Sequence, residues 1–258
     1  MSDSPLPEAS GALSGQVALV TGASSGLGWR FARVLANAGA TVVATARREE
    51  RLEELCRIAK QAGGEAVGYR LDMTDADDIE EVVERISREV GLISILVNNA
   101  GVPDAARAHK MSRELIDRVF DTNLRGPYLL SCEVARRLIE AEAPGRMINI
   151  SSGGAFYYAG NGAALYSITK AGIARMSEVL AVEWARNHIN VNCIAPGAFE
   201  SEMLAGMLER MGDITRHFPR KRVGDPAQLD STLLYLCSPE SEAVTGATIQ
   251  VDDGQGGR

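Results

Sequence analysis

The chain has 258 residues, of which 45% are hydrophobic, and this length suits one large α/β domain better than two smaller ones. Its net charge of −7 argues against a nucleic-acid-binding surface and against a basic patch for a membrane surface. No uninterrupted apolar stretch reaches the roughly 18 residues of a membrane span, so we expect no membrane partner.

The first residues are polar, and we expect a flexible tail over residues 1–13 with no secretory signal. From residue 16 onward, strand-like and helix-like segments alternate. In the first half, the expected strands are 16–22, 41–46, 65–72 and 93–101, and the expected helices are 28–39, 48–64 and 75–91. Asp75 and Asp77 fit the capping and helix-dipole preferences at the start of the third helix.

The second half of the chain continues the same alternation. The expected strands are 145–152, 189–197 and 246–252, and the expected helices are 112–141, 164–187, 225–238 and one or two short ones within 200–222. The first of these helices contains Gly126-Pro127, where we expect an interruption. The alternation predicts a single Rossmann-like domain over residues 14–258, with a doubly wound parallel sheet of about seven strands, helices on both faces and a substrate lid around 198–222.

Four cysteines and three histidines are scattered along the chain. They form no CxxC pair and no cluster with the spacing of metal ligands, so the sequence predicts neither a zinc site nor a disulfide framework. Reduced thiols in a cytoplasmic protein are the simplest interpretation.

A glycine-rich stretch, VTGASSGLG at residues 20–28, joins the first expected strand to the first expected helix. Backbone without side chains lets a pyrophosphate approach closely, and a helix N-terminus favours its negative charge. The alternative is a glycine-rich turn with no ligand, which the position after the first strand disfavours. The predicted cofactor-binding residues of this loop are Gly22, Ser24, Ser25, Gly26, Leu27 and Gly28.

Two arginines follow the second expected strand, where a dinucleotide's adenosine ribose would lie. An acidic residue there would bind the ribose hydroxyls of NAD, but Ala46 stands at that place, followed by Arg47 and Arg48. Guanidinium groups suit a 2′-phosphate, so the sequence favours NADP over NAD. Alternatively, the arginines balance the acidic residues Glu49 and Glu50.

Tyr166 and Lys170 lie four positions apart in an expected helix, so their side chains should share one face. Reduction of a ketone needs a hydride and a proton, and a tyrosine can supply the proton. Because a free phenol has a pKa of about 10, exchange at neutral pH requires about 4 kcal/mol of preferential phenolate stabilisation. We expect Lys170 and an oxidised nicotinamide to lower the pKa of Tyr166. The alternative is an ordinary half-buried pair on a packed helix.

Several motifs in order give the chain a family resemblance. They are TGASSGLG, NNAG at 98–101, Asn123 in DTNL, NISS at 149–152, YSITK at 166–170 and PG at 196–197. With these motifs the chain resembles the short-chain dehydrogenase/reductase family over residues 15–254. The resemblance implies a nicotinamide-dependent oxidoreductase. It also implies a homotetramer, in which paired long helices build dimers and the region of the final strand joins the dimers.

The resemblance also implies roles for individual residues. The catalytic set is Asn123, Ser152, Tyr166 and Lys170. Ser152 would donate a hydrogen bond to the substrate oxygen, and Asn123 would hold a water that links Lys170 to solvent. The implied cofactor contacts beyond the glycine loop are Asp72 and Met73 at the adenine, Asn99, Ala100 and Gly101 in the cofactor channel, Tyr166 and Lys170, and Pro196, Gly197, Phe199 and Ser201 near the nicotinamide.

The chain departs from the family pattern at four places. Ser152 and Tyr166 are 14 positions apart where 13 is common, which leaves Ser151 as an alternative donor, although the NISS motif favours Ser152. Ser25 stands where many NADP-using relatives have a basic residue, Ser201 replaces a threonine, and Asp253 stands where glycine is common. The extra residue suggests an altered wall of the substrate pocket.

The expected substrate pocket is aromatic and rich in methionine. Its candidate residues are Phe156, Tyr157, Tyr158, Phe199, Met203, Leu204 and Met207. Such a lining suits an apolar or bulky carbonyl compound, although the last three would equally fit a helix face in the core. The leading hypothesis is an NADP(H)-dependent enzyme that interconverts ketones and secondary alcohols. The alternatives are an NAD-dependent sugar or polyol dehydrogenase and a non-catalytic nucleotide-sensing scaffold.

Overall fold

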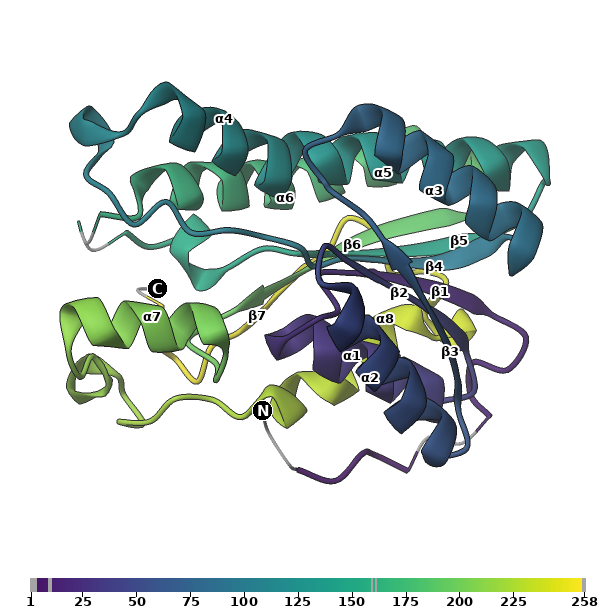
Figure 1. Ribbon diagram of the computed structural model, residues 1–258, viewed down its shortest axis with the longest axis horizontal. Coiled ribbons are helices and arrows are strands. Elements are labelled where there is room, and N and C mark those ends of the chain that lie inside the picture. The colour runs from purple at the N-terminus through teal and green to yellow at the C-terminus, as the bar shows by residue number, and fades with distance from the viewer. Residues whose placement is uncertain (1–3, 9–10, 159, 161, 257–258) are drawn as a thin grey trace.

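The computed structural model describes residues 4–8, 11–158, 160 and 162–256. Within these residues, seven strands form one sheet with the order β3-β2-β1-β4-β5-β6-β7, and all neighbouring strands are parallel (Figure 1). The strands are β1 Val17–Thr21, β2 Thr41–Ala46, β3 Glu65–Arg70, β4 Ile93–Asn98, β5 Gly145–Ile150, β6 Ile189–Pro196 and β7 Thr248–Val251. The α-helices are α1 Gly26–Asn37, α2 Glu49–Gln61, α3 Ala76–Glu89, α4 Arg113–Phe120, α5 Gly126–Glu140, α6 Ala164–Glu183, α7 Glu202–Met211 and α8 Asp230–Cys237.

Helices cover both faces of the sheet, as Figure 1 shows. One buried apolar cluster joins the sheet to α1, α2 and α8, and a second joins it to α3, α5 and α6. β5 and β6 are buried along their whole length, which is typical of central parallel strands. The predicted fold class is therefore confirmed. The strand order reverses between β1 and β4: β2 and β3 are added on one side of β1, and β4 to β7 on the other. Ligands of such folds bind at this switch point, beside the carboxyl ends of the strands.

The helix after β4 is interrupted earlier than the sequence predicted. A π-helical turn, Asp121–Arg125, separates α4 from α5, whereas the expected break at Gly126-Pro127 is wrong. Pro127 lies in the first turn of α5, where its missing N–H costs no hydrogen bond. Gly126 is required there because a Cβ would lie 2.2 Å from the carbonyl oxygen of Met73.

The segment expected to form one or two short helices contains α7 and a 3₁₀ turn at Thr215–His217. Beyond it, Asp253 adopts a positive φ of 54°. Its carboxylate accepts hydrogen bonds from Arg220 at 3.1 Å and Arg222 at 2.7 Å, which hold its pKa below the usual range. Asp253 therefore ties the C-terminal turn to the segment that follows α7.

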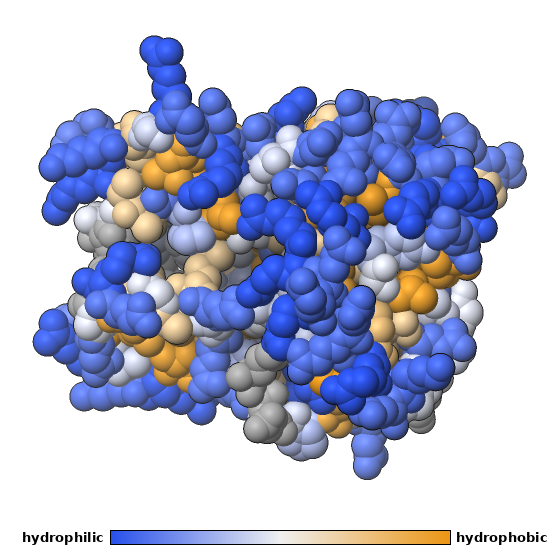
Figure 2. All heavy atoms as spheres, viewed as in Figure 1, coloured by the Kyte–Doolittle hydropathy of each residue, from blue (hydrophilic) through white to orange (hydrophobic). Residues whose placement is uncertain are grey.

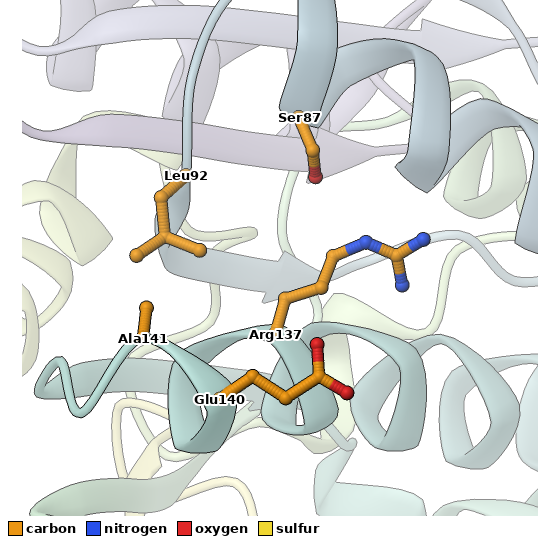
Figure 3. Close-up of a pocket in the computed structure, with 5 residues that line it drawn as sticks. All are labelled: Ser87, Leu92, Arg137, Glu140 and Ala141. Atoms are coloured by element: carbon orange, nitrogen blue, oxygen red, sulfur yellow. The ribbon is translucent and has the colours of Figure 1, made fainter.

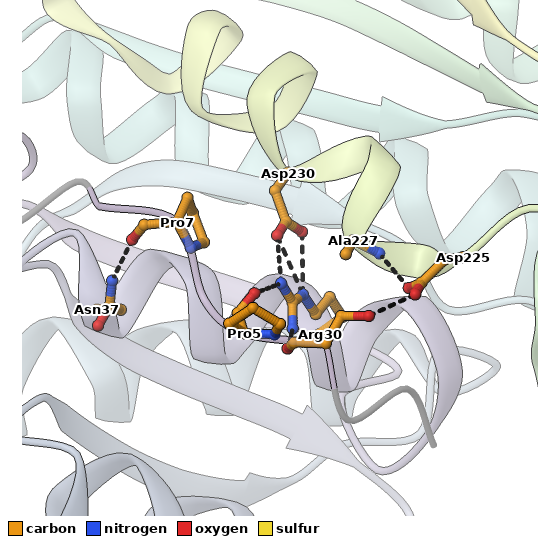
Figure 4. Close-up of polar contacts among 8 residues, drawn as sticks. Pro5, Pro7, Arg30, Asn37, Asp225, Ala227 and Asp230 are labelled. Carbon is orange, nitrogen blue, oxygen red and sulfur yellow. Dashed lines mark hydrogen bonds and ion pairs between the residues drawn. The ribbon is translucent and has the colours of Figure 1, made fainter.

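The N-terminal segment was expected to be a flexible tail over residues 1–13, of which 1–3 and 9–10 lie outside the described residues. The described part packs against the domain. Leu13 is only 1% exposed, and the carbonyl of Pro7 accepts a hydrogen bond from the Asn37 side chain at 2.9 Å (Figure 4). Over the part of the chain that the structure describes, no helix is long and apolar enough to cross a membrane.

A buried ion pair lies beneath this segment. Arg30 on α1 donates three hydrogen bonds to Asp230 at the start of α8, and the two side chains are 3% and 6% exposed (Figure 4). The remaining guanidinium donors reach the carbonyls of Ser4 at 2.6 Å and Pro5 at 2.7 Å. Burial raises the pKa of Asp230, although the hydrogen bonds from Arg30 oppose this shift. One cation therefore connects α1, α8 and the N-terminal segment.

Replacing Asp230 by alanine should destabilise the fold by about 3 kcal/mol, because it leaves a buried guanidinium without its counter-ion. The free energy of unfolding in urea measures this loss. The matched control is Glu178→Ala, which removes the partner of the exposed Arg175 and should cost less than about 1 kcal/mol. Equal losses for the two variants would contradict the prediction.

Candidate active site

The predicted site residues gather at the edge of the sheet formed by the carboxyl ends of β1, β4, β5 and β6 (Figure 1, left). The space-filling view shows this face hollowed between α7 below and the helices α4 and α6 above (Figure 2). The edge lies beside the switch point of the sheet, where the fold favours a ligand.

The glycine-rich turn packs tightly against the end of β4. A Cβ on Gly22 would lie 2.9 Å from the Cα of Ala100, and one on Gly28 would lie 2.4 Å from the Asn99 side-chain nitrogen. Thr21 completes the contact, because its hydroxyl accepts hydrogen bonds from the N–H groups of Asn99 and Ala100, both at 3.0 Å. Only glycines allow this approach.

The N-terminus of α1 fits a bound phosphate. Ser25 occupies the N-cap position but makes no side-chain capping hydrogen bond, so it does not use up the donors of the first turn. The start of α7 lies over this turn, since a Cβ on Gly26 would lie 3.3 Å from the Cβ of Ser201. A glycine cradle and an uncapped helix together suit a dinucleotide pyrophosphate.

The two arginines after β2 differ in their surroundings. Arg48 donates to the hydroxyl of Ser24 at 3.1 Å and forms an ion pair with Glu202 at 3.1 Å. Arg47 is exposed and lies near Asp72. Burial alone would raise the pKa of Asp72, but hydrogen bonds from Thr74 and the charge of Arg47 lower it. Of the two arginines, Arg48 therefore carries the salt bridge, whereas the exposed Arg47 lies beside Asp72.

Lys170 is buried and joins α6 to the end of β5. Its ammonium donates to the carbonyl of Ile150 at 2.7 Å and lies 5.7 Å from the ring centroid of Tyr166. Burial lowers the pKa of Lys170 to about 8. The expectation that Tyr166 and Lys170 share one face of a helix is therefore confirmed.

The two serines after β5 have different partners. The Ser151 hydroxyl is buried and donates to the carbonyl of Lys170 at 2.7 Å. Ser152 accepts the N–H of Gly154 at 3.1 Å, and its hydroxyl lies close enough to the Tyr166 phenol to lower the pKa of that group. The geometry therefore selects Ser152, rather than Ser151, as the partner of the phenol.

The side chains and burial of this protein raise the pKa of Tyr166, whereas the sequence predicted a lowered pKa with Lys170 and an oxidised nicotinamide beside it. Burial is the largest cause, because it favours the neutral phenol. The hydrogen bond from Ser152 lowers the pKa, while the carboxylate of Asp104 raises it. The sequence did not reveal that Tyr166 is partly buried or that Asp104 lies near it.

Asn123 lies in the π-helical turn and faces the loop after β4. Its side-chain oxygen accepts the N–H of Val102 at 2.8 Å, and its nitrogen donates to the carbonyl of Val102 at 2.9 Å and to Thr169 at 3.3 Å. A Cβ on Gly101 would lie 3.5 Å from the Lys170 nitrogen and 3.6 Å from the Asn123 oxygen. Asn123 and Lys170 therefore converge on Gly101.

Comparison with known proteins identifies the family of this chain. A family model described as enoyl-(acyl carrier protein) reductase matches residues 22–255. The 3-oxoacyl-(acyl-carrier-protein) reductase FabG of Thermotoga maritima is 36% identical over 244 residues, which cover 94% of this chain and 98% of that protein. The chain belongs to the short-chain dehydrogenase/reductase family. It is an oxidoreductase that uses a nicotinamide cofactor.

Further relatives of this short-chain dehydrogenase/reductase differ in their named substrates. A 2-dehydro-3-deoxy-D-gluconate 5-dehydrogenase of Formosa agariphila is 32% identical over 245 residues, covering 93% of this chain and 92% of that protein. A crystal structure of an actinorhodin polyketide ketoreductase variant with NADPH superimposes with a TM-score of 0.89 at 33% identity, covering 94% of this chain and 98% of that chain.

The segment after β6 completes the cofactor side of the site. A Cβ on Gly197 would lie 2.5 Å from the Gln255 side-chain oxygen and 2.9 Å from the Cα of Asp252. The ring of Phe199 lies against Gly224, where a Cβ would be 2.6 Å away. Pro196 ends β6, so Gly197 turns the chain towards α7 while the C-terminal turn packs beneath it.

The candidate substrate wall is exposed and apolar. Phe156, Tyr157 and Tyr158 are 48%, 54% and 46% exposed in the loop that carries the extra residue. Met203, Leu204 and Met207 on α7 are partly buried and do not belong to the buried core. These residues therefore remain available to a ligand.

Sequence reasoning missed a buried polar network below the site. The side chain of Asn98 donates to Ser131 at 2.9 Å and to Asn149 at 2.8 Å, and Asn149 donates to Ser177 at 2.9 Å. It also missed Asp104, which bonds to the start of α6. Asn98 and Asn149 stood in the quoted motifs, but Asp104 had no recognisable pattern.

Two other hollows lie away from these residues. One of about 320 Å³ is lined by Ser87, Leu92, Arg137, Glu140 and Ala141 (Figure 3). The other, of about 360 Å³, is lined by Glu142, Pro144, Arg146, Asn187, His188, Pro239 and Glu242. Both adjoin the amino ends of strands, β4 in one case and β5 in the other, and neither includes a predicted site residue.

The lowered pKa of Lys170 predicts a pH dependence of stability. The unfolded chain binds the Lys170 proton up to about pH 10.5, whereas the folded protein releases it at about 8, so stability rises with pH between these values. Relative to Lys170→Met, the wild-type free energy of unfolding should therefore increase by about 3 kcal/mol from neutral to alkaline pH. Denaturant unfolding of both proteins measures this difference, and a constant difference would count against a depressed Lys170 pKa.

Proposed function

We propose that this short-chain dehydrogenase/reductase interconverts a ketone and a secondary alcohol with NADP(H), using Tyr166 as general acid and base. The observation that carries the proposal is the proximity of the Ser152 hydroxyl to the Tyr166 phenol, whose pKa it lowers, with the Lys170 ammonium over the phenol ring. The pair lies at the same strand edge as the glycine cradle, which suits hydride transfer beside proton transfer.

The glycine turn with Gly22 and Gly28 would hold the dinucleotide, which would supply the hydride for the carbonyl carbon. Tyr166 then donates its proton to the developing alkoxide, and Ser152 donates a hydrogen bond to the same oxygen. In the reverse direction, Tyr166 accepts the proton of the alcohol. Lys170 lies near the phenol and stabilises its anion, while its link to the Ile150 carbonyl fixes the ammonium.

Because the pKa of Tyr166 is raised, its phenolate form must be stabilised by nearby positive charge. Burial keeps the phenol neutral, which suits its role as the acid in ketone reduction. Alcohol oxidation requires the phenolate, so positive charge must be present when the proton moves. Lys170 is one source of that charge, and the oxidised cofactor is the other.

Arg47 and Arg48 support NADP as the cofactor. Among the described residues, the salt bridge belongs to Arg48, so the exposed guanidinium of Arg47 can bind a 2′-phosphate directly. Arg48 is already paired with Glu202 and bonded to Ser24, so we assign it to holding the start of α7 near the glycine turn. The actinorhodin ketoreductase structure with NADPH is consistent with this choice.

The exposed aromatic side chains favour an apolar or bulky carbonyl substrate. The similarity to a 2-dehydro-3-deoxy-D-gluconate 5-dehydrogenase supports the second candidate, a sugar or polyol dehydrogenase. A nucleotide-sensing scaffold is the weakest candidate, because every catalytic position carries a working side chain. Exposed Ile168, Val179 and Val182 on α6, at 58%, 48% and 79%, support the paired-helix dimer contact of the proposed homotetramer.

Tyr166→Phe should retain cofactor binding and lose at least about 100-fold in kcat, because it removes the hydroxyl that transfers the proton and leaves the ring in place. Cofactor fluorescence gives the dissociation constant, and nicotinamide absorbance gives the turnover on a panel of ketones and alcohols. The panel should combine bulky apolar ketones with sugar acids, so that it separates the two substrate classes. A variant with wild-type turnover would refute the acid–base role.

Arg47→Ala should raise the KM for NADPH by about 10-fold or more and leave that for NADH nearly unchanged, since only NADPH carries the phosphate. Arg48→Ala is the matched control and should affect both cofactors alike, because it loosens α7. Steady-state kinetics with both cofactors distinguishes the two effects. An unchanged preference in Arg47→Ala would remove this assignment.

A further inference from the structure

The first turn of α6 receives its cap from a distant segment. The N-cap residue of α6 is Ala163, whose side chain cannot accept a hydrogen bond. The carboxylate of Asp104, in the loop after β4, accepts instead the N–H groups of Leu165 at 2.8 Å and Tyr166 at 3.0 Å. These are the donors that a side chain at the N-cap ordinarily satisfies.

Asp104 is a buried carboxylate that accepts hydrogen bonds from backbone N–H groups. It is 3% exposed, and its second oxygen accepts the N–H of Ala105 at 2.8 Å. Within the described residues, no lysine, arginine or histidine forms an ion pair with it. The positive end of the long helix α6 balances its charge. Burying a carboxylate costs free energy unless its charge is balanced and its oxygens accept hydrogen bonds.

The loop that carries Asp104 is held at both ends by residues of the site. Asn123 binds the N–H and the carbonyl of Val102, two residues before Asp104. Ala105, directly after Asp104, adopts a positive φ of 47°. The loop therefore forms a short bridge between Asn123 and the N–H of Tyr166.

We propose that Asp104 is a positioning residue that holds Tyr166 against Ser152 through the first turn of α6 and tunes proton transfer by its negative charge. The proposal rests on the proposed role of Tyr166 as acid and base. Its second part agrees with the direction of the Tyr166 pKa, which burial raises most, which the Ser152 hydrogen bond lowers and which Asp104 raises.

Few charged groups face Tyr166. Lys170 lies over its ring from the same helix, Asp104 approaches from the loop after β4, and the β5 side presents the uncharged Ser152. Beyond Lys170 lies Cys193 on β6, whose pKa is raised by burial. Removing the charge of Asp104 leaves Lys170 as the nearest charge, so the Tyr166 pKa should fall.

The test is a titration of the phenol in the full-length chain with NADP⁺ bound. Phenolate absorbance is recorded against pH for the wild type and for Asp104→Asn, each as a difference from the same protein carrying Tyr166→Phe. Asp104→Asn keeps one acceptor oxygen but loses the charge, and its Tyr166 midpoint should fall by about half a pH unit or more. Glu178→Gln, an exposed acid on the same helix, is the matched control and should leave the midpoint unchanged.

Kinetics supply the second measurement. The acid limb of kcat for alcohol oxidation should move to lower pH in Asp104→Asn, and Asp104→Ala should also lose about 10-fold or more in kcat with little change in cofactor binding. If Asp104→Asn fails to fold, Ala163→Ser in the same chain restores a local cap without the charge, and the lower midpoint should persist.

An unchanged midpoint in the folded variants would overturn the proposal. That outcome is distinct from failure of the proposed function, in which Tyr166→Phe keeps its turnover whatever the midpoints are. If the midpoint falls but the Asp104→Ala kcat is unchanged, the positioning part is wrong.

Discussion

The hydrogen bond from the buried Lys170 ammonium to the Ile150 carbonyl determines the arrangement of the rest of the site. A buried charge without a good partner is unstable, so this bond prevents α6 from sliding along the end of β5. Ser151 reinforces it by donating to the Lys170 carbonyl. With α6 held in this register, Tyr166 lies one helical turn before Lys170 and meets Ser152.

The cofactor side of the site depends on a second constraint, the contact between the glycine turn and the end of β4. The missing side chains of Gly22 and Gly28 let the turn lie against Ala100 and Asn99. Since β4 also leads into the loop of Asp104, the same strand connects the nucleotide cradle to the cap of α6. The proposed proton and hydride transfers would therefore take place beside the same strand.

Much of the architecture was predictable because local patterns match the fold. Continuous apolar strands, helix-period segments and the Asp75 cap, which accepts the N–H groups of Asp77 and Asp78, indicated the parallel sheet and its helices. The π-helical turn at Asp121–Arg125 was not predictable from Gly126-Pro127. Gly126 is constrained by the close approach of the Met73 carbonyl, a tertiary contact, and not by the proline that follows it.

The sequence by itself determined which side chains could do the chemistry, because Tyr166, Lys170, Ser152 and the glycine turn occur in ordered motifs with helix and strand spacing. Only the tertiary structure decided that Ser152 rather than Ser151 reaches the phenol, and that burial raises the pKa of Tyr166. It alone brought Asp104 to the start of α6 across 61 positions in the chain. Burial and long-range contacts depend on packing, which no local spacing records.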